Sequence, residues 1–137
     1  MSGLWPQAGP TIITANHESY LDGPMLALLA PRPILFGVDP DFSTREPWRS
    51  LLLAWGRISG GHRMVPMTPG SSRGLREMLR WLREGGWVCL FPEGGIGTGR
   101  EYPGVHWLAD RSGARIHPLE IRAVGVGKAK IPYIITN

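Results

Sequence analysis

The sequence predicts an α/β fold: a single three-layer domain in which a mostly parallel or mixed sheet carries helices on both faces. The first observation is that short β-rich apolar runs alternate with runs of helical periodicity along the chain. The second is size, because 137 residues with 42% hydrophobic content suit one domain with a substantial core. The 19 glycines and 13 prolines lie scattered among apolar segments, so no low-complexity tract is present. We therefore expect one domain over residues 1–137.

The expected strands are short runs of apolar and β-branched residues that are bounded by Gly, Pro or charged residues. They cover residues 11–14, 34–38, 64–67, 87–91 and 115–121. Helical runs fall between them at residues 23–30, 44–58, 72–84 and 104–112.

Several helix boundaries carry their own signals. Asp22-Gly23-Pro24 is typical of a helix start, with Asp in the capping position and Pro in the first turn. Residues 43–46 (STRE) have the form of a capping box, and Gly85-Gly86 ends the third helix.

The third helix separates an apolar stripe from a face of arginines. The stripe consists of Leu75, Met78, Leu79 and Leu82, and the arginines are Arg73, Arg76, Arg80 and Arg83. Two of the arginines have a Glu four residues later, which favours local pairing. A solvated face is therefore the favoured interpretation, and an anion-binding stripe is the alternative.

Composition excludes several classes of protein. No run approaches the roughly 20 apolar residues of a membrane span, and the N-terminus lacks the regions of a signal peptide. The single Cys89 excludes an intramolecular disulfide and favours a reducing compartment. The four histidines are dispersed, so we expect no metal, and no nucleic-acid-binding module is recognisable. The abundance of Arg and Trp suits either phosphate groups and membrane interfaces or an ordinary core and surface.

The stretch NHESYLD, residues 16–22, places a His and an Asp five positions apart. On one regular helix they would lie roughly 140° apart, which is too far round to touch. They can meet only across a bend, with His17 leaving a strand and Asp22 starting a helix. In that arrangement a carboxylate orients an imidazole that still faces a ligand.

A second unusual stretch, FPEGGIGTGR, covers residues 91–100 and follows the most apolar strand. Its glycines allow backbone N–H groups to approach an anion, and Arg100 adds a bidentate donor. The spacing does not match a dinucleotide-binding fingerprint. A phosphate site and an ordinary Gly-rich turn both remain open.

The segment GSSRG, residues 70–74, indicates a different enzyme class. It matches G-x-S-x-G, so that Ser72 would be a hydrolase nucleophile with Asp110 and His117 downstream. Pro69-Gly70 loosens the turn, however, and N-capping explains the serines equally well. The serine hydrolase stays as the alternative.

Taken together, the two unusual stretches resemble the glycerolipid acyltransferase family of the lysophosphatidate type. The family signature is N-H-x-S-x-x-D followed by F-P-E-G, and the matching positions are Asn16, His17, Ser19, Asp22 and residues 91–94. The resemblance extends over residues 11–121, where IHPLEI occupies the place of a late family strand, and leaves 122–137 as an uncovered tail. The chain looks most similar to 2-acylglycerophosphoethanolamine acyltransferase domains. It has GGHRMVPMT in place of the family's Arg-containing middle motif.

The resemblance implies acyl transfer from a thioester, either acyl-CoA or an acyl-carrier protein, to the hydroxyl of a lysophospholipid or glycerol phosphate. His17 would be the general base and Asp22 its orienting carboxylate. The implied substrate-binding residues are Asn16, Ser19, Arg63, Glu93, Gly94, Gly95 and Arg100.

No cofactor or metal is expected beyond the thioester co-substrate. The expected location is cytoplasmic and peripheral, on the inner face of the membrane, where anionic lipid attracts surface Arg and Trp. Arg76 and Arg83 are the first candidates for that contact. A non-catalytic lipid-binding role is the remaining alternative.

Overall fold

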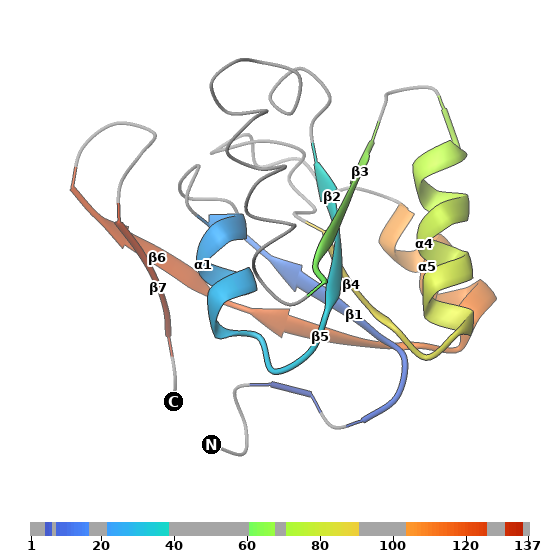
Figure 1. Cartoon of the computed structure of the whole chain (residues 1–137), viewed down its shortest axis with the longest axis horizontal. Helices are drawn as coiled ribbons and strands as arrows, with labels where there is room; N and C mark the ends of the chain where they lie inside the picture. The colour runs from blue at the N-terminus through green and yellow to red at the C-terminus, as the bar shows by residue number, and fades with distance from the viewer. Residues whose placement is uncertain are drawn as a thin grey trace.

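A parallel sheet lies between two helical layers, and a separate hairpin extends from one end of the molecule (Figure 1). The computed structural model describes residues 5–6, 8–16, 22–38, 61–67, 71–90, 104–125 and 131–135. The strands are β1 (Thr11–Ala15), β2 (Ile34–Val38), β3 (Arg63–Pro66), β4 (Trp87–Leu90), β5 (Arg115–Leu119), β6 (Ile121–Val124) and β7 (Ile131–Ile134). The helices are α1 (Asp22–Leu29), α4 (Arg73–Arg83) and α5 (Gly104–Ser112).

Within the described residues, the main sheet has five strands in the order β3-β2-β4-β1-β5, and every pairing in it is parallel. From β1 the chain passes through α1 to β2 on one side of β4. From β3 it then returns through α4 to β4, and through α5 to β5, in the opposite direction. Because crossovers between parallel strands are right-handed, this reversal puts α1 on one face of the sheet and α4 and α5 on the other.

Each face of the sheet packs its own apolar cluster. Under α4 and α5 lie Ile12, Leu35, Val65, Met78, Leu79, Leu82, Val88, Leu90, Val105, Leu108 and Ala114. Under α1 lie Ile13, Ala15, Leu26, Ala27, Ile34, Phe36, Trp87, Cys89, Leu119 and Ile121. Successive residues of β1 and β4 thus alternate between the clusters, which is the period of two that a strand covered on both faces requires. The predicted three-layer architecture is confirmed.

Helix α4 is defined more sharply by its C-terminus than by its N-terminus. Gly85 has a φ of 89°, and the N–H groups of Gly85 and Gly86 donate to the carbonyls of Leu82 and Trp81. This is the Schellman pattern, in which Gly is favoured because other residues avoid positive φ. At the other end, the Ser72 side chain makes no capping bond, and the Ser71 hydroxyl accepts from the Arg73 N–H instead. The expected helix end is therefore confirmed, whereas the cap comes from the neighbouring serine.

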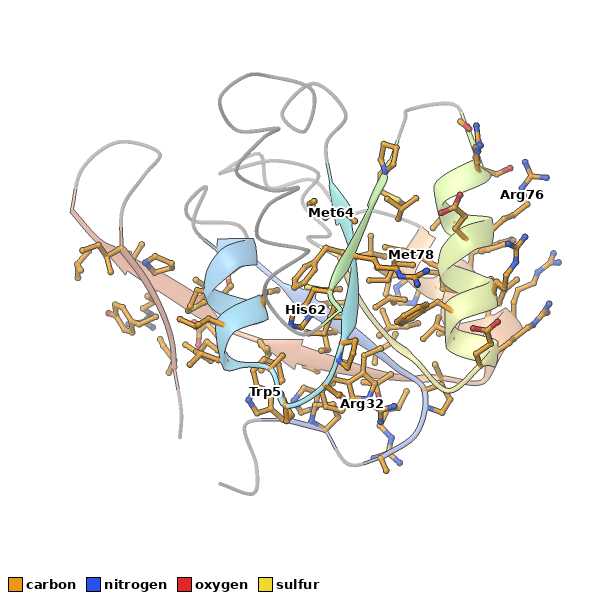
Figure 2. All side chains as sticks on the ribbon, in the orientation of Figure 1. Trp5, Arg32, His62, Met64, Arg76 and Met78 are labelled. Atoms are coloured by element: carbon orange, nitrogen blue, oxygen red, sulfur yellow. The ribbon has the colours of Figure 1, made fainter. Side chains whose placement is uncertain are left out.

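The predicted stripe of α4 is confirmed, since Met78 and Leu82 are buried against the sheet while Arg76 points away from it (Figure 2). All four arginines of α4 are exposed. Among the described residues, however, no ion pair links them to Glu77 or Glu84. These side chains are exposed to solvent, and the expected i,i+4 pairing is not observed among the described residues.

The strands expected at 11–14, 34–38, 64–67 and 87–91 are present to within one residue, as are the helices expected at 23–30, 72–84 and 104–112. The helix expected at 44–58 lies outside the described residues. The single strand expected at 115–121 is wrong, because it divides at Glu120 into β5 and β6. From Ile121 onward the chain forms β6 and β7, which pair as an antiparallel hairpin.

Tryptophan and arginine cluster at the amino-terminal edge of the sheet, where they build structure. Trp5 stacks on Trp87 at 6.2 Å, and the Arg32 guanidinium lies 5.0 Å from the Trp87 ring on its way to the Gly85 carbonyl. Trp5 and Arg32 lie at the same edge in Figure 2. Trp87 thus takes part in an aromatic stack with Trp5 and in a cation–π contact with Arg32. Of the two interpretations that composition left open, these residues follow the structural one.

His62 is buried at this same edge. It directly precedes β3 and contacts both β2 and α1. Its Nδ1 accepts a hydrogen bond of 2.9 Å from the Ile34 N–H, and its ring lies against Phe36. Burial lowers the pKa of His62, opposed by a hydrogen bond with the backbone of Ala27 in α1. The lowered pKa and the hydrogen bond that Nδ1 accepts both favour the neutral imidazole in the folded protein.

We expect stability to fall as the pH drops below about 6.5, because the unfolded chain then takes up a proton that folded His62 resists. The free energy of unfolding should decrease by at most about 1.4 kcal/mol per pH unit from this group. Urea unfolding at pH 7.5 and pH 5.5 measures this decrease in the free energy of unfolding. His62→Gln retains an acceptor but cannot titrate, so it should show a smaller loss between the two values. Equal losses in both proteins would contradict the assignment.

Candidate active site

The topology marks one position on the sheet as a ligand site. Strands β1 and β4 are neighbours, with Thr14 paired to Leu90. The chain leaves β1 toward α1 on one face and leaves β4 toward α5 on the other. In open α/β sheets, such a reversal opens a crevice at the carboxyl ends of the two strands, and ligands bind there.

Both unusual stretches of the sequence begin at this position. NHESYLD starts one residue after β1 ends at Ala15, and FPEGG starts directly after β4 ends at Leu90. Since neighbouring strands lie about 4.8 Å apart, the two stretches leave the sheet side by side. His17 and Ser19 of the first stretch lie outside the described residues, as do Glu93, Gly94, Gly95 and Arg100 of the second.

The backbone around the first stretch has the expected form. Strand β1 ends at Ala15 and α1 begins at Asp22, so the chain changes from strand to helix between them. The prediction that His17 follows a strand while Asp22 starts a helix is confirmed at this level.

Asn16 is the one predicted site residue of the first stretch whose side-chain contacts are described. Its Nδ2 donates to the Ile121 carbonyl and its Oδ1 accepts from the Ile121 N–H, both at 2.6 Å. The amide thereby replaces the backbone partner that a strand would supply, across 105 residues of sequence. It fixes the end of β1, immediately before His17, to the start of β6. A substrate-binding role for Asn16 stays a prediction.

Arg63 lies away from this edge. It shares a row of the sheet with Leu35, Val88 and Ile12 near the amino-terminal ends of the strands. Strand geometry separates its Cα from that of Asn16 by roughly 13 Å along the strands and roughly 14 Å across them. Its guanidinium lies 5.4 Å from the Trp81 ring. The structure does not bring Arg63 to the switch point, and its role in binding substrate stays a prediction.

The alternative catalytic set, Ser72 with Asp110 and His117, is not assembled. Ser72 precedes α4 and Asp110 lies on α5, both on one face of the sheet. His117 pairs with Ile13, whose side chain lies in the cluster on the opposite face. The sheet thus separates the imidazole from the other two groups.

Within the described residues, no group of three or more His, Cys, Asp or Glu side chains could hold a metal ion. The helices of this part of the chain are all too short or too polar to cross a membrane.

A family model described as Acyltransferase matches residues 4–121. The chain belongs to the acyltransferase family. The matched range includes every strand of the five-stranded sheet and both stretches at its switch point, and it ends where β6 begins.

The fold is also that of a solved acyltransferase. The crystal structure of the 1-acyl-sn-glycerophosphate (LPA) acyltransferase PlsC from Thermotoga maritima matches with a TM-score of 0.57 and 20% sequence identity. The match covers 91% of this chain and 48% of that one, so the chain spans about half the length of that protein. The acyltransferase family and the PlsC fold that the two stretches implied are confirmed.

Sequence reasoning did not find the partner of Asn16. Ile121 contributes only backbone atoms, and no residue type signals such a contact. The available signal was the position of Asn16, a residue with one donor and one acceptor group directly after a strand.

We expect Asn16→Ala to leave the N–H and carbonyl of Ile121 without their partner. At about 1 kcal/mol for each hydrogen bond, the free energy of unfolding should fall by about 2 kcal/mol. The Ile121 amide should exchange with deuterium much faster than in the wild type. Asn16→Asp, which keeps the acceptor and loses the donor, should still protect that amide. Unchanged protection in Asn16→Ala would contradict the contact.

Proposed function

We propose that the chain transfers a fatty acyl group from a thioester to the hydroxyl of a lysophospholipid or glycerol phosphate, with His17 as general base. The observation that carries the proposal is the departure of both stretches from neighbouring strands, β1 and β4, at the switch point of the sheet. Membership of the acyltransferase family supports the same reaction class. Lysophosphatidate is the first acceptor to test, because the solved neighbour is named for it.

In the proposed reaction the acceptor oxygen attacks the thioester carbonyl carbon while a ring nitrogen of His17 takes the hydroxyl proton. A neutral imidazole with an ordinary pKa near 6.5 is suited to this transfer at neutral pH. The tetrahedral intermediate then expels the thiolate, and the imidazolium gives the proton to that leaving group. An ester bond forms and the thioester bond breaks.

Asp22 is proposed to accept a hydrogen bond from the other ring nitrogen of His17, which fixes the tautomer and stabilises the imidazolium. The start of α1 at Asp22, seven residues after β1 ends at Ala15, supports this role, because a change from strand to helix between the two residues allows a bend. The acceptor hydroxyl occupies the place that a serine takes in a catalytic triad. No covalent acyl-enzyme is therefore formed.

The remaining proposed contacts concern the substrates. Glu93, Gly94 and Gly95 would line the acceptor pocket, and backbone N–H groups of that stretch with Arg100 would bind its phosphate. Ser19, two residues after His17, is proposed as a further substrate contact. The donor is acyl-CoA or an acyl-carrier protein, which implies action at the cytoplasmic face of a membrane without a further cofactor.

We expect His17→Ala to reduce acyl transfer by about 10²- to 10⁴-fold, the usual loss when a general base is removed. Asp22→Asn should be strongly impaired as well, because an amide does not stabilise the imidazolium. Release of free thiol from an acyl thioester, measured with lysophosphatidate present, gives the rate. His106→Ala on the exposed face of α5 is the matched control and should retain activity. A folded His17→Ala protein with the wild-type rate would falsify the mechanism.

If the protein were a serine hydrolase, Ser72 would be the nucleophile and its removal would abolish activity. Since the sheet separates His117 from Ser72, we expect Ser72→Ala to keep full activity and a fluorophosphonate probe to leave Ser72 unlabelled. Mass spectrometry of the probe-treated protein reads out the label. If the probe labels Ser72 and activity is lost in proportion to the labelling, the protein is a serine hydrolase, and the proposed acyl transfer to a lipid is wrong.

A further inference from the structure

The β6–β7 hairpin has one face toward the core and one toward solvent. Ile121 pairs with Ile134 and packs into the cluster under α1. Pairs directly opposite on antiparallel strands share a face, and successive pairs alternate. The pairs Arg122 with Tyr133 and Val124 with Ile131 are separated by one pair, so all four side chains lie on the outward face.

This outward face is unusually apolar for a solvent-facing surface. Val124 is 56% exposed, Ile131 66% and Tyr133 46%. Arg122 and Glu120 are also exposed and pair at 3.6 Å. The sequence that joins the two strands adds Lys128 and Lys130, so residues 120–137 contain three cationic side chains and one carboxylate.

Aliphatic side chains beside tyrosine and cations are the composition of surfaces that rest in the interface of an anionic bilayer. The aliphatic groups enter the headgroup boundary, tyrosine bridges apolar and wet layers, and Lys and Arg meet lipid phosphates. Exposed aliphatic residues that cluster on two strands also indicate a binding surface, whereas singly scattered ones do not.

The hairpin is joined to the candidate active site. Asn16 holds the first residue of β6 by two hydrogen bonds, and His17 comes next after Asn16. From Ile121 the hairpin extends away from the five-stranded sheet, at the end of the molecule opposite α4 and α5 (Figure 1). The two hydrogen bonds therefore fix the position of the hairpin, and of any surface that it contacts, relative to the carboxyl end of β1.

We propose that the outward face of the β6–β7 hairpin is the surface by which this protein rests on an anionic phospholipid bilayer. This inference rests on the proposed function, because a lysolipid acceptor resides in such a bilayer. It replaces the arginines of α4 as the first contact. The outward face of α4 exposes Arg76 and Arg83 but none of the exposed large apolar side chains of the described residues. It therefore has charge without groups that insert.

The test compares three double variants in sedimentation with vesicles of phosphatidylglycerol and phosphatidylethanolamine at low salt. Val124→Ser with Ile131→Ser should weaken binding at least about tenfold, since two aliphatic side chains leave the interface. Leu28→Ser with Leu29→Ser is the matched control, because these α1 residues are 69% and 49% exposed and lie outside the hairpin. It should bind as the wild type does, and so should Arg76→Gln with Arg83→Gln.

Acyl transfer is measured in parallel with two acceptors. The hairpin variant should lose transfer to lysophosphatidate embedded in vesicles and keep transfer to a short-chain lysophosphatidate that is dispersed as monomers. Hairpin-dependent vesicle binding without any transfer to the dispersed acceptor, even by the wild type, would contradict the proposed function while supporting the contact surface.

Three results would overturn the inference. In the first, the hairpin variant binds vesicles as tightly as the wild type. In the second, binding is lost in the α4 or α1 variant instead, which places the contact elsewhere. In the third, the wild type ignores anionic vesicles and sedimentation velocity shows a dimer that the hairpin variant abolishes, so that the occupant of this face is a second copy of the chain.

Discussion

Two hydrogen bonds between the side chain of Asn16 and the backbone of Ile121 join the carboxyl end of β1 to the start of β6. Without them the β6–β7 hairpin would be held to the sheet mainly by the packing of Ile121 and Ile134 beneath α1. An isolated two-stranded hairpin is only marginally stable in water, so this attachment matters. It also holds the residue that precedes His17. The same amide therefore couples the position of the proposed base to the position of the proposed membrane contact.

The two edges of the sheet have separate roles. At the amino-terminal edge, the stacked rings of Trp5 and Trp87, the guanidinium of Arg32 and the buried imidazole of His62 hold strands and α1 together. At the carboxyl edge, the chain direction reverses between β1 and β4, the place where ligands bind in open α/β sheets, and both unusual stretches begin there. Stability and proposed chemistry are thus built at opposite ends of the same strands.

Much of the sheet follows from sequence, because β2 and β4 are continuous apolar runs and α4 has a clear apolar stripe ending at Gly85. The hairpin was missed for local reasons. Glu120 interrupts an otherwise continuous run, and Pro132 argues against a strand, although an edge strand such as β7 tolerates it. The candidate site was predicted from Asn16, His17 and Asp22, and their roles stay predictions. The contact of Asn16 was not predictable, since its partner is backbone 105 residues away. The distance of Arg63 from the site depends on strand register, which a single sequence does not specify.

In the proposed mechanism, the imidazole of His17 at the carboxyl end of β1 takes the acceptor's proton. The dependence of kcat/KM on pH tests it most directly, measured between pH 5 and 8 with the short-chain, dispersed lysophosphatidate so that vesicle binding does not contribute. We expect a rate that rises tenfold per pH unit at low pH and levels off near the pKa of an imidazole, about 6.5. In Asp22→Asn, the inflection should move to lower pH, because the imidazolium loses its carboxylate partner. A rate that is flat across this range, in a protein that stays folded throughout, would contradict a histidine base.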